Sequence, residues 1–164
     1  MKKVITSILI IVLAFILCGY IITKRDTKDY GAKIYYVDHS MLRLVPMDVN
    51  FEKTTTKGAA EKMIKMLIDG KDKNPKILRV IPDEKNCMRV EIKNKTAIVD
   101  IKETFIKNKP ANKVHGLLAV YSIVNSLTSI EGIDTVKFSF DGNVEKGFVP
   151  NLDMRETFIP DYYL

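Results

Sequence analysis

The sequence predicts an α+β domain in which two helices cover one face of a mostly antiparallel sheet, a two-layer α/β arrangement preceded by one transmembrane helix. Three patterns lead to this prediction. A long charge-free apolar run opens the chain, two later segments repeat apolar residues at helical spacing, and several short segments rich in β-branched and aromatic residues surround them. The expected order after the membrane helix is β-α-β-β-α-β with a short C-terminal return strand.

The apolar run covers residues 4–22 and contains no charged residue. At 1.5 Å per residue a helix of this length spans about 28 Å, close to the hydrocarbon thickness of a bilayer. Neither Leu17-Cys18-Gly19 nor Ile21-Ile22-Thr23 has the small residues of a signal-peptide cleavage site. We therefore expect residues 1–23 to remain as a transmembrane anchor. The alternative is a lipoprotein modified at Cys18, for which Leu17 is a poor preceding residue.

The charges beside the anchor bear on its orientation. Lys2 and Lys3 favour a cytoplasmic N-terminus, whereas Lys24, Arg25 and Lys28 on the far side weaken that preference. A very short N-terminal tail followed by a long domain usually leads to translocation of the domain. We therefore expect a single-pass protein of the cell membrane with an extracytoplasmic domain.

The segment after the anchor is charged and ends in glycine, so residues 24–31 are expected to be a linker and residues 32–164 the folded domain. Residues 33–38 are aromatic and β-branched and predict the first strand. Tyr35 and Tyr36 would point to opposite faces of this strand. We expect at most one of them in the core and the other free to contact a partner.

Residues 42–51 contain Pro46, which predicts an irregular or edge segment. Residues 59–69 have the periodicity of an amphipathic helix. The connection over residues 71–86 is expected to contain a short extended piece at 78–81. The apolar positions of the helix are Ala60, Met63, Ile64, Leu67 and Ile68.

A hairpin follows, with strands at residues 88–93 and 96–101 joined by Asn94-Lys95. Residues 113–129 form the second helix. Because apolar residues cover well over half of its circumference, this helix is expected to be the more buried of the two. Its apolar positions are Val114, Leu117, Leu118, Val120, Tyr121, Ile123, Val124 and Leu127.

The last predicted strand is residues 135–140, where Val136, Phe138 and Phe140 share one face. The dipeptide Asp141-Gly142 predicts a tight turn that returns the chain through residues 144–148. The tail, residues 151–164, is expected to pack loosely along an edge.

The reactive side chains give no pattern for catalysis, a cofactor or a metal. His39 and His115 have no second ligand at metal-binding spacing, and Cys87 is expected to be a small buried residue. The acyl-transfer motifs G-x-S-x-G and S-x-x-K and the glycine loops that bind phosphate are missing from the sequence. Asp38, Asp100 and Glu103 lie at predicted strand ends, where solvated carboxylates are more common than a glycosidase pair. The sequence therefore predicts a protein that is not an enzyme.

The net charge of +6 comes from interleaved acidic and basic residues. Such a surface is unlike the concentrated basic face of a nucleic-acid-binding protein. The most basic stretch contains Lys71, Lys73, Lys76, Arg79 and Lys85. A solvated loop is the simpler interpretation, and a contact for an acidic partner or an anionic polymer is the alternative.

A series of motifs spread over residues 32–157 resembles the GerMN domain family of spore germination proteins. The most specific piece is Ile123-Val124-Asn125-Ser126-Leu127-Thr128-x-Ile130-x-Gly132-Ile133-x-x-Val136-x-Phe138, which continues to Asp141-Gly142. The earlier pieces are Ile34-Tyr-Tyr-Val-Asp38, Leu44-Val45-Pro46, the helix with Met63 and Leu67 closed by Gly70, Ile81-Pro82, Val90-x-Ile92, Ala97-x-Val99-Asp100-Ile101 and Phe105.

The resemblance implies a non-enzymatic extracytoplasmic domain similar to ring-building motifs, the small α/β modules that assemble side by side in the sporulation channel. It implies a role in sporulation or germination through assembly with other envelope or sporulation proteins, or with further copies of itself. The family's sporulation member resembles a lipoprotein with tandem domains, whereas this chain has one domain. The alternative function is a binding module for peptidoglycan or another anionic wall polymer, using the basic stretch.

Overall fold

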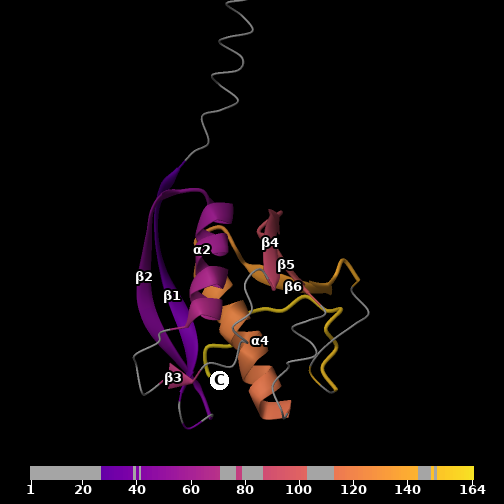
Figure 1. Ribbon diagram of the computed structural model, residues 1–164. Helices are drawn as coiled ribbons and strands as arrows, with labels where there is room; N and C mark the ends of the chain where they lie inside the picture. The colour runs from indigo at the N-terminus through magenta and orange to yellow at the C-terminus, as the bar shows by residue number, and fades with distance from the viewer. Residues whose placement is uncertain are drawn as a thin grey trace, which may run out of the picture.

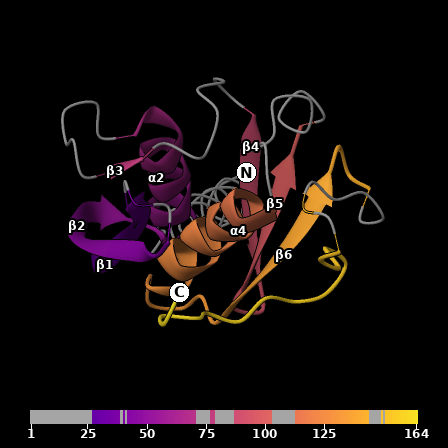
Figure 2. The ribbon, with the colours of Figure 1, turned by 90° about the horizontal axis from the view of Figure 1, so that it is seen from below.

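The computed structural model describes residues 27–38, 40, 42–70, 77–78, 87–102, 113–143, 149 and 151–164. Within them the chain forms two helices and two three-stranded sheets, with strand orders β2-β1-β3 (sheet A) and β4-β5-β6 (sheet B). Figures 1 and 2 show the helices between the two sheets. The elements are β1 (Lys28–Asp38), β2 (Leu44–Thr54), α2 (Thr56–Asp69), β3 (Ile77–Leu78), β4 (Met88–Lys93), β5 (Thr96–Ile101), α4 (Lys113–Thr128) and β6 (Thr135–Phe140).

The α+β class is confirmed, but the expectation of a single mostly antiparallel sheet in two layers is wrong. Strand β1 pairs with β3 only at Val37 and Asp38, and helix α4 lies along the same side of β1 further towards its N-terminus. Because α4 occupies this edge of β1, the hairpin of β4 and β5 cannot pair there and belongs to a second sheet. In sheet B, β6 pairs with β5 in parallel, since α4 forms the crossover between these two strands.

Strand β2 lies at the edge of sheet A, so of the two alternatives expected around Pro46, an irregular or an edge segment, the edge strand is confirmed. In two antiparallel strands, successive residue pairs alternate. The residues of one pair exchange backbone hydrogen bonds, and in the next pair the backbone N–H and C=O groups point away from the partner strand. Pro46 is paired with Tyr35, and the backbone N–H and C=O of Tyr35 bond to side chains of α4 instead. The missing N–H of Pro46 therefore removes no bond between the strands, and a regular edge strand forms. Strand β1 begins at Lys28, within the segment expected as a linker.

Helix α2 begins three residues before the predicted start. Thr55 caps it, since the Thr55 hydroxyl oxygen accepts from the N–H of Gly58 at 3.1 Å. Gly70 ends it at φ 65°, where its N–H bonds to the carbonyl of Met66. The buried face comprises Ala59, Ala60, Met63, Ile64, Leu67 and Ile68, which confirms the predicted apolar positions.

Both predicted tight turns are confirmed. Asn94 and Lys95 have φ of 48° and 62°, as a two-residue turn between twisted antiparallel strands requires. After β6, Asp141 and Gly142 also have positive φ, and a single bridge joins Phe140 to Asn143. The predicted return strand at 144–148 lies outside the described residues.

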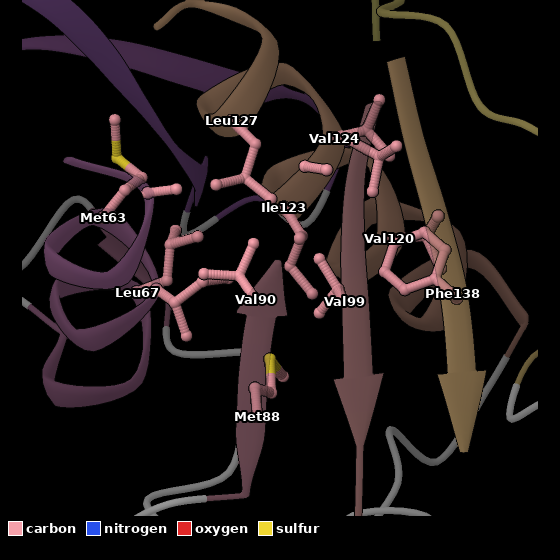
Figure 3. Close-up of a cluster of buried hydrophobic side chains, with 14 of the residues drawn as sticks. Met63, Leu67, Met88, Val90, Val99, Val120, Ile123, Val124, Leu127 and Phe138 are labelled. Atoms are coloured by element: carbon pink, nitrogen blue, oxygen red, sulfur yellow. The ribbon is translucent and has the colours of Figure 1, made fainter. Parts of the chain in front are cut away.

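The main core lies between the helices and sheet B. Figure 3 shows Met63 and Leu67 of α2, Ile123 and Leu127 of α4, and Val90 of β4 together in this core. A smaller cluster between sheet A and α4 contains Tyr35, Val37, Leu44 and Leu118. The first cluster covers one face of β1 and the second covers the other, so the expectation that Tyr35 or Tyr36 would stay free is wrong: both are buried.

Nothing in the described part of the chain is a helix of the length and apolarity needed to cross a bilayer. The predicted anchor at residues 1–23 lies outside that part.

Candidate interaction surface

The basic stretch proposed as a contact, Lys71, Lys73, Lys76, Arg79 and Lys85, lies outside the described residues, as do His39 and Glu103. Within the described ranges no group of three or more His, Cys, Asp or Glu residues is arranged to hold a metal.

The two strand-end carboxylates that the structure describes have local partners. Asp100 accepts hydrogen bonds from the Ser139 hydroxyl at 2.6 Å and from the N–H of Gly142 at 2.9 Å, which holds the turn after β6. Asp38 accepts from Arg43 at 3.1 Å. Mainly because of this bond, the pKa of Asp38 lies below its ordinary value. Both carboxylates therefore stabilise local structure.

Helix α4 covers the edge of β1 on the N-terminal side of its short pairing with β3. The Ser122 hydroxyl donates to the carbonyl of Tyr35 at 2.5 Å, and the Ser126 oxygen accepts from the N–H of Tyr35 at 2.8 Å. One turn later, the Ser129 hydroxyl accepts from the N–H of Lys33 at 2.9 Å and donates to its carbonyl at 2.8 Å. Three serines at helical spacing thus replace the ladder of a neighbouring strand.

A second polar face of α4 binds the C-terminal tail. Asn125 is fully buried. Its amide nitrogen donates to the carbonyl of Asp161 at 2.6 Å, and its amide oxygen accepts from the N–H of the same residue at 2.9 Å. The side chain therefore pairs with a backbone as a strand would. These serines and Asn125 were not singled out as functional residues from the sequence. The feature that could have found them is the presence of polar residues inside a largely apolar helix.

The tail, which we call the C-terminal strap (residues 151–164), joins the two sheets. Val136 of β6 and Phe158 exchange two backbone hydrogen bonds of 2.9 and 2.8 Å. At the other end, the N–H of Leu44 in β2 donates to the carbonyl of Leu164 at 2.9 Å. Figure 2 shows the strap, in yellow, running from β6 past α4. The tail does follow an edge, that of β6, but the expectation of loose packing is wrong.

Aromatic contacts add to these bonds. The Phe158 ring lies edge-on to Phe138 at 5.3 Å and to Tyr121 at 6.2 Å between centroids. The Tyr162 ring lies 5.5 Å from that of Tyr35. Aromatic pairs at these separations stabilise beyond the area that they bury. The inner side of the strap is thus matched closely to the body of the domain.

The last residues of the strap expose apolar side chains to solvent. Of the large hydrophobic side chains exposed in the described ranges, three belong to the strap: Ile159, Tyr162 and Tyr163, the last fully exposed. Clusters of exposed apolar side chains are typical of interaction sites. The other two are Leu42 and Val114. We define Ile159, Tyr162 and Tyr163 as the strap surface.

A groove of about 250 Å³ lies on the opposite face of sheet A, beside the end of α2. Its apolar lining is Ile34, Tyr36, Met47, Val49 and Met66. Burial, and to a smaller extent the nearby Asp69 carboxylate, raises the pKa of Tyr36, so this phenol stays neutral at physiological pH. The groove suits an apolar side chain better than a charged ligand.

Comparison with known proteins relates the chain to sporulation. The model of the Germane family, described as "Sporulation and spore germination", matches residues 33–146. No curated protein matches the chain.

Three solved structures are similar to the described fold. A candidate lipoprotein from Clostridium perfringens is 17% identical, with a TM-score of 0.57 over 84% of this chain and 93% of that one. The first GerMN domain of the sporulation protein GerM from Bacillus subtilis is 21% identical, with a TM-score of 0.55 over 76% and 95%. The tandem GerMN domains of the same protein give 22% identity and a TM-score of 0.58 over 76% and 45%. The last comparison shows that this chain corresponds to about half of the tandem protein.

Proposed function

Because the chain belongs to the Germane family of sporulation and spore germination proteins, we propose that it acts in that process by binding other envelope proteins, and not as an enzyme. The observation that carries this proposal is the strap surface. Ile159, Tyr162 and Tyr163 expose apolar side chains on a segment whose other side is fixed to both sheets. A rigid apolar surface loses little conformational entropy when a partner covers it, which favours binding.

We further propose that the domain is held outside the cytoplasm by the anchor at residues 1–23. The charge-free run and its length support this assignment. Strand β1 begins at Lys28, six residues after Ile22, and an extended chain of this length reaches about 20 Å. The folded domain would therefore stay close to the membrane surface, and its partners would be membrane proteins or proteins that approach the membrane.

Site-specific crosslinking in sporulating cells tests the proposal. A photoreactive residue at position 163 of the full-length chain should give adducts with envelope proteins, and one at Lys62, on the exposed face of α2, serves as the matched control. Adducts that form equally at both positions, or at neither, would contradict binding through the strap surface. Labelling of a single cysteine introduced at position 62 by a membrane-impermeant reagent in intact cells tests the extracytoplasmic location.

Binding of an anionic wall polymer through Lys71, Lys73, Lys76, Arg79 and Lys85 is the second candidate, and it is supported by charge alone. Electrostatic binding of this kind weakens with salt. If it is the main activity, the protein should sediment with purified cell wall at low salt and be released at high salt, whereas the crosslinks at position 163 should be absent.

A further inference from the structure

Strand β4 is an outer strand of sheet B, and a groove of about 270 Å³ lies between its edge and helix α2. Figures 2 and 3 show α2 on the side of β4 opposite to β5. We propose that this groove, the β4 groove, binds an extended segment of a partner protein, which adds to β4 as a further antiparallel strand. This inference rests on the proposed function, a domain that binds other proteins, and concerns a surface separate from the strap.

The edges of β2 and β6 are protected against such pairing. Strand β2 contains Pro46, which has no N–H to offer, and the N–H of its Leu44 is bonded to Leu164. The edge of β6 pairs with the strap at Phe158. Proline and covering segments are common protections of edge strands. Among the described residues, neither protection is found at β4.

The pairing with β5 determines which backbone groups of β4 face the groove. The N–H of Lys102 bonds to the carbonyl of Cys87 at 2.8 Å, so Cys87 belongs to the pairs that exchange hydrogen bonds. Because such pairs alternate, the N–H and C=O groups of Met88, Val90 and Ile92 point away from β5. Within the described ranges no residue forms a hydrogen bond with these groups.

These backbone groups favour an occupant that offers a backbone of its own. Met88 is 6% exposed and Val90 is 5% exposed, so water has little access to their polar atoms. A buried N–H or C=O group without a partner is unfavourable. An extended peptide provides an N–H and a C=O at every second residue along its edge, which is the spacing that β4 presents.

The opposite wall of the β4 groove can admit such a segment. Ile64 of α2 provides an apolar surface, and Lys57 and Glu61 lie along the rim. The ammonium of Lys57 is 3.8 Å from the Glu61 carboxylate, and more than half of each side chain is exposed. Exposed ion pairs of this kind contribute little stability, so these two side chains can move aside when a peptide enters.

Arg89 and Glu91 determine the sequence of the occupant. Both side chains are exposed, and Glu91 forms only an exposed pair with Lys93 at 3.7 Å. Opposite charges on neighbouring strands stabilise a sheet, and like charges destabilise it. An antiparallel segment reaches Glu91 first and Arg89 two residues later, so it should carry a basic, an apolar and an acidic residue in this order. The apolar residue then lies opposite Val90.

Two peptides test the proposal on the full-length protein in detergent. One has the order valine, lysine, valine, glutamate, valine, and in the other the lysine and glutamate are exchanged. Both have blocked ends and a dye for fluorescence anisotropy. We expect the first peptide to bind about five-fold more tightly, because only this order makes both charge pairs favourable. The double variant Arg89→Glu with Glu91→Arg should reverse the preference.

The matched control is Lys33→Asp with Asp48→Lys, which exchanges an exposed ion pair of sheet A and should keep the wild-type preference. Equal binding of the two peptides to the wild type, or no measurable binding, would overturn the proposal. A preference that the exchange at Arg89 and Glu91 fails to reverse would overturn it as well. Crosslinking at position 163 reports on the strap surface alone, so failure there is distinguished from failure at the β4 groove.

Discussion

The bond between Asn125 and the strap offers the most direct test of the structure. Asn125→Ala removes two hydrogen bonds to Asp161 at a fully buried site. A hydrogen bond contributes about 0.5–1.5 kcal/mol net, and the deleted carboxamide leaves a void. We therefore expect the free energy of unfolding to fall by about 2–3 kcal/mol. With a urea m-value of roughly 2 kcal/mol/M, the midpoint should drop by about 1–1.5 M.

The measurement is urea unfolding of the domain without its first 23 residues, followed by circular dichroism. Asn50→Ala in β2 is the matched control, because Asn50 is exposed and surface substitutions usually change stability by less than about 0.5 kcal/mol. Equal midpoints for the two variants would refute the assignment of Asn125 as the residue that fixes the strap.

A second variant separates the loss of bonding from the loss of volume. Asn125→Asp keeps the acceptor for the N–H of Asp161 but places a carboxylate oxygen against its carbonyl. Burial should raise the pKa of the new carboxyl, so its protonated form is favoured in the folded state. This variant should then lose stability as the pH rises above the unfolded-state pKa of about 4. A stability difference from wild type that does not change between pH 4 and 7 would contradict this account.

Three further predictions concern single side chains. Ser126→Ala leaves a buried N–H of β1 without its acceptor and should lower the free energy of unfolding by about 1–3 kcal/mol in the same urea assay. A serine-to-alanine substitution at an exposed site should leave the free energy of unfolding nearly unchanged. Gly31→Ala should raise the melting temperature slightly, because a Cβ there meets no atom within 4 Å, whereas Gly142→Ala, at φ +77°, should lower it; the reverse order in calorimetry would contradict the two backbone conformations. Arg155 holds the pKa of Asp153 at about 2, below the ordinary 3.8, so this pair stabilises the fold above about pH 4 and loses its effect as the pH falls towards 2; Arg155→Gln should raise the Asp153 pKa in an NMR titration.

Local patterns were sufficient for most elements. The turn at Asn94-Lys95 and the apolar face of α2 depend on residues adjacent in sequence or one helical turn apart, and both were predicted. Pro46 left two alternatives open, an irregular segment or an edge strand, because the rule for proline in strands depends on which backbone groups face the neighbouring strand. That information comes from the pairing with Tyr35, which a single sequence does not contain.

The division into two sheets could not be predicted for a similar reason. Serines inside an apolar helix are usually explained by bonds to the helix's own carbonyls. Here Ser122 and Ser126 bond to the backbone of Tyr35, about 90 residues earlier in the chain. The candidate surface had the same difficulty: the tail was expected to pack loosely along an edge, but the fixed inner side of the strap depends on Asn125.

Helix α4 connects these observations into one argument about function. A buried serine or asparagine is unfavourable unless a partner meets its hydrogen bonds, and on α4 each such partner is a backbone: β1 on one side and the strap on the other. The stretch from Ile123 to Phe138, the most specific part of the family resemblance, therefore builds the architecture and is largely unavailable to a ligand. Residues that set the function of such a domain should then lie on segments that α4 holds in place, and the strap, with Ile159, Tyr162 and Tyr163 exposed, is one of these segments. Replacing Ile159 and Tyr163 by the residues of a related domain would thus be expected to change the crosslinked partners and leave the unfolding midpoint nearly unchanged, whereas a change at Asn125 should alter both.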